Sequence, residues 1–260
     1  MNTAACRNRL IRVSLPAAAS MLCLVLSYAA IQSAEPPKIS EFAPSKDLLQ
    51  QVDFFIGRIS ESLADPADFD GAKQSRTLKD ANTLAALALV LGVHDQSFPE
   101  RASMPSLREA ATRLAEAGED SARANAALEA IRKARTGIDQ ASGAAKWEKT
   151  ASLAALMKQV PLVHTGLKRG VEPNRLARQA AQSAGQSASL AAIAQAAMLD
   201  DEYAKTPADL QQWVAFCAEM RDAAGQVNSA VHKQDPPAVA AGMKRLAASC
   251  ETCHAKFRQP

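Results

Sequence analysis

The sequence predicts an all-α protein. Beyond about residue 40, apolar residues recur with a period near 3.6, and the strict apolar-polar alternation typical of strands does not occur. Hydrophobic residues make up 48% of the chain but aromatic residues only 4%, and alanine is far more prominent than β-branched runs. This composition favours packed helices over sheets. It also supports a sizeable core, which excludes disorder as the main state.

The apolar pattern predicts eight helices, separated by clusters of Pro, Gly and Asp. Thr206 and Pro207 are typical of a helix start, because a hydroxyl caps free N–H groups and proline suits the first helical position. Pro161 falls inside the fifth segment, where it should kink or break the helix. The expected helices span residues 45–62, 69–93, 106–117, 122–137, 146–169, 173–199, 207–231 and 237–256.

An internal repeat suggests how these helices are grouped. Residues 48–52 (LLQQV) match residues 156–160 (LMKQV) at a shift of 108. Residues 84–88 (LAALA) match residues 190–194 (LAAIA) at a shift of 106. Although alanine-rich helices also resemble one another by composition, the matches favour a duplication. We therefore expect two tandem antiparallel four-helix bundles, over residues 35–142 and 143–260.

Residues 1–34 have the pattern of an export signal. Arg7, Arg9 and Arg12 precede an apolar stretch that is interrupted by Pro16, and small residues then offer a cleavage site. We expect this segment to be removed, which leaves a periplasmic protein without a stable membrane span. The segment holds three of the 30 Lys and Arg side chains and none of the 27 Asp and Glu, so the remainder is formally neutral. A neutral chain without a basic run argues against nucleic-acid binding.

The strongest motif is Cys250-Glu251-Thr252-Cys253-His254, the C-x-x-C-H signature of covalent haem c attachment. Two thiols three residues apart on a helix can add to the two vinyl groups of one porphyrin, and the adjacent imidazole can ligate the iron. Three alternative roles compete with haem attachment: a redox C-x-x-C, a simple disulfide, and a zinc site that also uses Cys217. The redox motif normally begins a helix, whereas this one falls at the end of an expected helix. A disulfide would leave His254 without a role. Because Cys253 and His254 are adjacent, both would have difficulty reaching one tetrahedral zinc ion.

The position of the motif restricts the other axial ligand. Only six residues follow His254, so a sixth iron ligand must come from an earlier helix or be missing. A vacant position would admit small gases, whereas a Met or His ligand would favour a dedicated electron carrier.

The C-terminal run 248–258 (ASCETCHAKFR), with an aromatic residue three positions after the histidine and a basic residue next, resembles that of the cytochromes c prime and their low-spin, methionine-ligated relatives. The resemblance covers residues 145–260 and is specific only at the end. It implies an up-down-up-down bundle with one haem c on the fourth helix and the distal face covered by the first helix. Carried onto this chain, the distal position falls between Leu153 and Met157, so Met157 is the candidate sixth ligand. Pro161 departs from the family pattern.

Other candidates carry weaker signals. Trp213 and Phe216 lie three residues apart on one expected helix and can line the porphyrin, although such pairs are more often plain core. Arg258 can pair with a propionate or remain a solvated terminal charge. Met157 can equally fill a gap in the core, and His164 on the same helix competes with it as a ligand.

These observations predict a one-haem c-type cytochrome that is not an enzyme and that transfers single electrons between periplasmic redox partner proteins. A homodimer is possible, as in the family it resembles. The alternative is a five-coordinate haem protein that binds nitric oxide or carbon monoxide. A peroxidase would need a distal acid-base group, and the sequence offers no convincing one.

Overall fold

The computed structural model describes residues 38–137 and 145–258, and these form eight α-helices with no β-strand among them. The predicted signal segment and the predicted boundary between bundles at residues 142–143 lie outside the described residues. In chain order the helices are α2 (Ser45–Ser62), α3 (Gly71–Gly92), α4 (Met104–Ala115), α5 (Ser121–Arg135), α6 (Leu153–Gly170), α7 (Ala180–Ala197), α8 (Pro207–His232) and α9 (Pro236–Phe257). Three short 3₁₀ turns, Ile39–Glu41, Pro66–Asp68 and Pro99–Ser103, lie between or before them.

The all-α prediction is confirmed, and every predicted helix exists. Most observed bounds fall within two residues of the expected ones, but α6 and α7 each begin seven residues later than predicted. Ser152 caps α6 by accepting a hydrogen bond from the N–H of Ala155, so the preceding residues form an extended approach. A series of turns fills most of residues 171–179, and the helical hydrogen-bond pattern of α7 begins only at Ala180.

Side-chain caps fix four other helix starts. Asp70, Asp120 and Asp235 accept backbone N–H groups at the starts of α3, α5 and α9. Thr206 accepts the N–H of Asp209, and Pro207 occupies the first position of α8, which confirms the predicted start. Each cap satisfies a donor that has no partner inside its helix.

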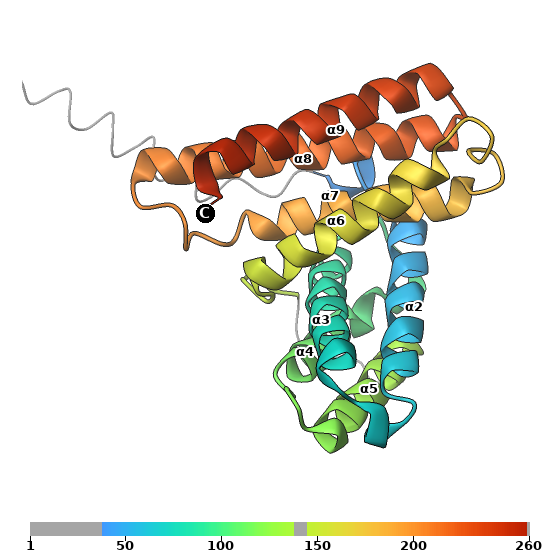
Figure 1. Ribbon diagram of the computed structural model, residues 1–260, viewed down its shortest axis with the longest axis vertical. Coiled ribbons are helices and arrows are strands. Elements are labelled where there is room, and N and C mark those ends of the chain that lie inside the picture. Colours follow the sequence, from blue (N-terminus) through green and yellow to red (C-terminus); the bar gives the residue numbers. More distant parts are fainter. Residues whose placement is uncertain (1–37, 138–144, 259–260) are drawn as a thin grey trace, which may run out of the picture. The chain divides into compact units, whose positions relative to one another are not determined.

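The helices pack in two sets that touch each other (Figure 1). In the first set each helix packs against the next along the chain, and α2 also packs against α5. In the second set α6 packs on α7, α7 on α8, and α8 on α9. Contacts of α2 and α3 with α7, and of α3 with α6, connect the sets.

The helices α3 and α7 form the centre. Nearly every residue of α7 from Ser183 onward, and of α3 from Asp80 onward, is buried. A helix buried on all sides needs small side chains where its neighbours approach, which accounts for the abundance of alanine. At Gly225 of α8 a Cβ would lie 2.7 Å from the Cβ of Phe42, so that position accepts only glycine without displacing its neighbour.

Buried polar groups also join the two sets. The carboxylate of Asp47 in α2 accepts hydrogen bonds from Asn228 and His232 of α8, each at 2.7 Å from its Oδ2. The hydroxyl of Ser189 in α7 donates to Gln51 in α2 at 3.3 Å. Since one cluster of buried apolar side chains also includes residues of both sets, the described residues share a continuous core.

The helix α6 runs unbroken through Pro161. Proline has no N–H, so the carbonyl of Met157, four residues earlier, receives no helical hydrogen bond from it. The helix therefore continues with one hydrogen bond missing beside Met157.

Candidate functional site

A cavity of about 450 Å³ lies among α6, α7, α8 and α9. All seven residues predicted from the sequence as site residues line it, and they come from three helices and the residue after α9. They are Met157, Trp213, Phe216, Cys250, Cys253, His254 and Arg258. A volume of this size falls within the roughly 300–1,000 Å³ that is typical of cofactor sites.

The C-x-x-C-H motif occupies the last turns of α9. Cys250 and Cys253 are three residues apart, which puts them on one helix face, and both are half-buried in the cavity wall. His254, one turn after Cys250, lines the same cavity while remaining exposed to solvent. One helix end thus presents two thiols and an imidazole to one space.

The cysteines are in the thiol form. Cys217, Cys250 and Cys253 are all free, so the disulfide alternative finds no support in the structure. Burial raises the pKa of Cys250, and burial together with the neighbouring Cys250 raises the pKa of Cys253 to about 11. A redox C-x-x-C depends on the opposite shift, because the thiolate is the reactive species. The environment therefore favours protonated, slowly oxidised thiols.

The zinc alternative is likewise unsupported. Among residues 38–137 and 145–258 there is no group of three or more His, Cys, Asp or Glu side chains arranged to hold a metal ion. Cys217 is buried in the cavity wall, packed with Leu153, Ala197 and Trp213. Burial raises its pKa strongly, so it remains an uncharged thiol.

Part of the cavity wall belongs to α6. Leu153, Met157, Val160 and Pro161 line the cavity, whereas Leu156 packs against the inner core formed by α3 and α7. Met157 is half-buried and borders two apolar clusters. Its side chain is thus available on the cavity side, as a sixth ligand requires, while it also fills space between clusters.

An aromatic cluster closes one side of the cavity. The indole N–H of Trp213 donates to the carbonyl of Ala197 at 2.9 Å, which fixes the ring. The Phe257 ring packs edge-on against Trp213 at 5.3 Å between centroids and against Phe216 at 6.0 Å. Tyr203 also stacks on Trp213, with 6.5 Å between ring centroids. These contacts join the four rings into one continuous side of the cavity lining.

Sequence reasoning missed several lining residues. Tyr203 comes from the loop between α7 and α8, and no periodic pattern marks a loop residue as part of a site. Phe257 lies seven residues after Cys250, two helical turns along the same face, so the spacing could have identified it. Lys158 follows Met157 on α6 and places a second exposed cation, besides Arg258, on the lining.

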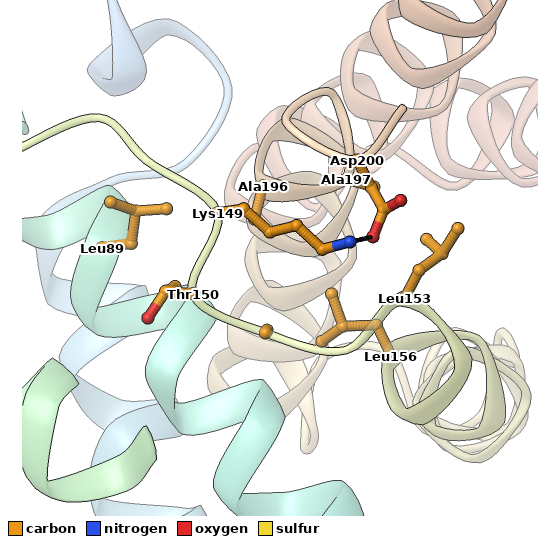
Figure 2. A pocket seen from close by; sticks show the side chains of 9 residues that line it. Leu89, Lys149, Thr150, Leu153, Leu156, Ala196, Ala197 and Asp200 are labelled. Atoms are coloured by element: carbon orange, nitrogen blue, oxygen red, sulfur yellow. Dashed lines mark ion pairs between the residues drawn. The ribbon is translucent and has the colours of Figure 1, made fainter. Parts of the chain in front are cut away.

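An ion pair between a half-exposed lysine and a buried aspartate restrains the loop that carries Tyr203. The Lys149 ammonium lies 2.6 Å from Oδ2 of Asp200, whose side chain is 4% exposed (Figure 2). The other oxygen of Asp200 accepts the N–H of Glu202 at 3.1 Å. Leu153 and Ala197 separate this pair from the large cavity, since they line both spaces. The adjacent Asp200 carboxylate raises the pKa of Lys149.

A second ion pair holds α9 against α8. The Lys256 ammonium lies 2.7 Å from Oδ1 of Asp209 and also donates to Gln212. Because Lys256 is two residues after His254, this link restrains the end of α9 that carries the motif.

The other histidines lie away from the cavity lining. His94 is fully buried, with its Nε2 3.1 Å from the carbonyl of Ala43 and its Nδ1 accepting the N–H of Gln96. His232 ends α8 and pairs with Asp47. His164 lies on α6 but lines a different space, between α6 and α9. The competing proposal of His164 as a ligand in the large cavity is therefore not supported.

No helix of the described residues is long and apolar enough to cross a membrane. No family model, curated protein or solved structure matches this chain.

Proposed function

We propose that this protein is an exported c-type cytochrome that transfers single electrons between periplasmic redox partners. The main observation that supports this proposal is that Cys250, Cys253 and His254 line one cavity together with Met157, Trp213, Phe216 and Arg258. A motif that matched by chance would have no reason to open onto a cofactor-sized space.

The residues present suit a haem c. The wall is mostly apolar and aromatic, as a porphyrin requires, and the exposed cations Lys158 and Arg258 on the lining can pair with its carboxylates. Each thiol would add across one vinyl double bond, with its hydrogen passing to the vinyl group, so attachment needs no oxidant. The free thiols of Cys250 and Cys253 are in the state that this addition uses. His254 would be the proximal ligand.

When bound, haem c supplies a one-electron redox centre whose potential depends on axial ligation and burial. The contribution of this chain is to hold His254 at the end of a helix restrained by Lys256 and to form part of the cavity wall with α6. The packed aromatic cluster would give the haem an apolar side wall.

The alternative function is binding of a small gas at a five-coordinate iron. Leu153 and Val160 flank Met157 on the cavity wall, and an apolar distal side without an axial methionine would admit nitric oxide or carbon monoxide. The choice depends on whether Met157 ligates the iron.

Two measurements test the proposal. A pyridine haemochrome assay and an intact mass should give one covalent haem per chain, and the Cys250→Ala/Cys253→Ala variant should lack it. A Cys217→Ala variant is the matched control and should keep its haem. Absence of a haem adduct in correctly exported protein would overturn the proposal.

We also propose that α2–α5 and α6–α9 are tandem four-helix units. The matched segments support this idea, because residues 48–52 and 156–160 fall in α2 and α6, and residues 84–88 and 190–194 fall in the two central helices. The second unit would carry the haem, and the first would serve partner docking or dimerisation.

A further inference from the structure

A second cavity, of about 340 Å³, lies between the last turns of α6 and the first turns of α9. It shares no lining residue with the cavity that holds the C-x-x-C-H motif. Its volume falls within the roughly 300–1,000 Å³ range of small-molecule sites.

Apolar side chains form most of this cavity. The contributing positions on α9 are 236, 239, 240, 243, 244 and 247, which is the spacing of one helix face. Val239 is buried at the base, and Met243 and Val171 lie beside it. Such a surface suits an aliphatic or aromatic body.

The polar groups of the lining are all basic. Lys168 and Lys244 approach the cavity from α6 and α9, and neither makes an ion pair with any residue in the described part of the chain. The Nε2 atom of His164 is buried without a hydrogen-bond partner, one turn before Lys168. Among residues 38–137 and 145–258, no acidic side chain lines the cavity. Burial and the nearby Lys168 lower the pKa of His164, so the charge there comes from the lysines.

The backbone cannot supply the anion contacts. The helix α9 begins with Pro236 and Pro237, and proline has no N–H, so its N-terminus lacks two of the donors that usually bind anions. A single histidine and two lysines also make a poor metal site. The chemistry therefore favours a ligand with one anionic group and an apolar body.

We propose that this cavity binds a small soluble carboxylate with an apolar body. The body would lie against Val171, Val239 and Met243, while Lys168 and Lys244 would donate to the carboxylate. The proposal does not depend on haem attachment, because the two cavities are separate.

The test uses octanoate and its uncharged counterpart octanamide, titrated calorimetrically into the purified full-length protein. We expect octanoate to bind saturably and about fivefold or more tightly than octanamide, since exposed cations contribute modestly to each contact. In the Lys168→Gln/Lys244→Gln variant the two affinities should become equal. The charge-matched Arg169→Gln/Lys233→Gln variant should keep the difference, because neither residue lines the cavity.

A second variant tests the location. Ala240 is exposed on the cavity wall, so Ala240→Trp should fill the space without disturbing the core and should abolish binding of both ligands. Three results would each overturn the proposal. The first is no saturable binding of octanoate, and the second is equal affinities for octanoate and octanamide in the unmodified protein. The third is unchanged binding in both the lysine variant and Ala240→Trp.

Discussion

At the scale of single residues, the environments of two side chains, Met157 and Asp80, can be tested with point variants. Met157 presents its thioether to the cavity beside a carbonyl that Pro161 leaves without a helical donor. Asp80, whose side chain is fully buried in α3, is paired with Arg58 at 2.9 Å, yet one of its oxygens has no partner. Each leads to a measurement on a point variant.

Replacement of Met157 by Ala should change the ligation of the haem. If Met157 is the sixth ligand, the reduced unmodified protein should be low-spin and unaffected by carbon monoxide, and Met157→Ala should become high-spin and bind it. Absorption spectra with and without the gas make the comparison. Leu153→Ala, in the same wall, is the control and should keep the low-spin spectrum. A low-spin spectrum in Met157→Ala would exclude Met157 as the ligand.

Asp80 should make the protein less stable as pH rises through the mildly acidic range. Burial raises the pKa of Asp80 to about 6 from 3.8, and Arg58 only partly opposes this shift. Between these values the folded state binds more protons than the unfolded state, so the contribution of Asp80 to the free energy of unfolding falls as pH rises from about 4 to 7. The change should be about 1–3 kcal/mol.

Urea unfolding at pH 5 and pH 7 checks this expectation. The Asp80→Asn variant cannot titrate, so it should lose less stability between the two pH values than the unmodified protein. Equal losses would show that Asp80 does not titrate in this range.

At the scale of helices, local sequence patterns predicted the number of helices and most of their bounds, which composition alone does not give. The eight helices follow from apolar periodicity and from caps such as Thr206, because both act within a few residues. The late start of α7 did not follow, since residues 171–179 are helix-forming in composition but adopt turns. In the site, the motif was predictable from the spacing of its residues and Met157 only from the family resemblance, whereas Tyr203 depends on tertiary packing of a loop against Trp213.

Pro161→Ala should stabilise α6. The alanine would restore the hydrogen bond to the carbonyl of Met157 and raise the free energy of unfolding by about 1–3 kcal/mol. Thermal unfolding followed by circular dichroism measures the change. Pro207→Ala is the matched control, because Pro207 occupies the first position of α8 where no helical bond is missing, and it should change stability little. A stability loss in Pro161→Ala would show that the proline relieves strain in α6.

At the scale of the whole molecule, the described helices behave as one packed unit because their core is continuous. The Asp47 contacts to Asn228 and His232 cross between the helix sets, and buried apolar side chains of both sets belong to one cluster. Even if the two helix sets arose by duplication, we therefore expect them not to unfold independently of each other.

We expect one cooperative unfolding transition. In a Trp147→Phe variant, Trp213 is the sole tryptophan and reports on α8, while circular dichroism reports on all helices. The two signals should change together with denaturant. Asp47→Ala should lower the midpoint of both by the same amount, at a cost of about 1–3 kcal/mol, because it leaves buried Asn228 without one of its acceptors. A circular dichroism transition that precedes the fluorescence change would show two separate units.

The small residues at close helix contacts have a consequence for how this protein can diversify. Where α8 meets Phe42 at Gly225, even one added carbon displaces a neighbour, and the same holds for Gly242 of α9, whose Cβ would lie 2.8 Å from Val227. In a saturation mutagenesis library, the tolerance of positions to substitution should therefore increase from the buried positions to the surface. Variation should concentrate on the solvent-facing sides of the outer helices, and the axis of the molecule should keep its alanines and glycines.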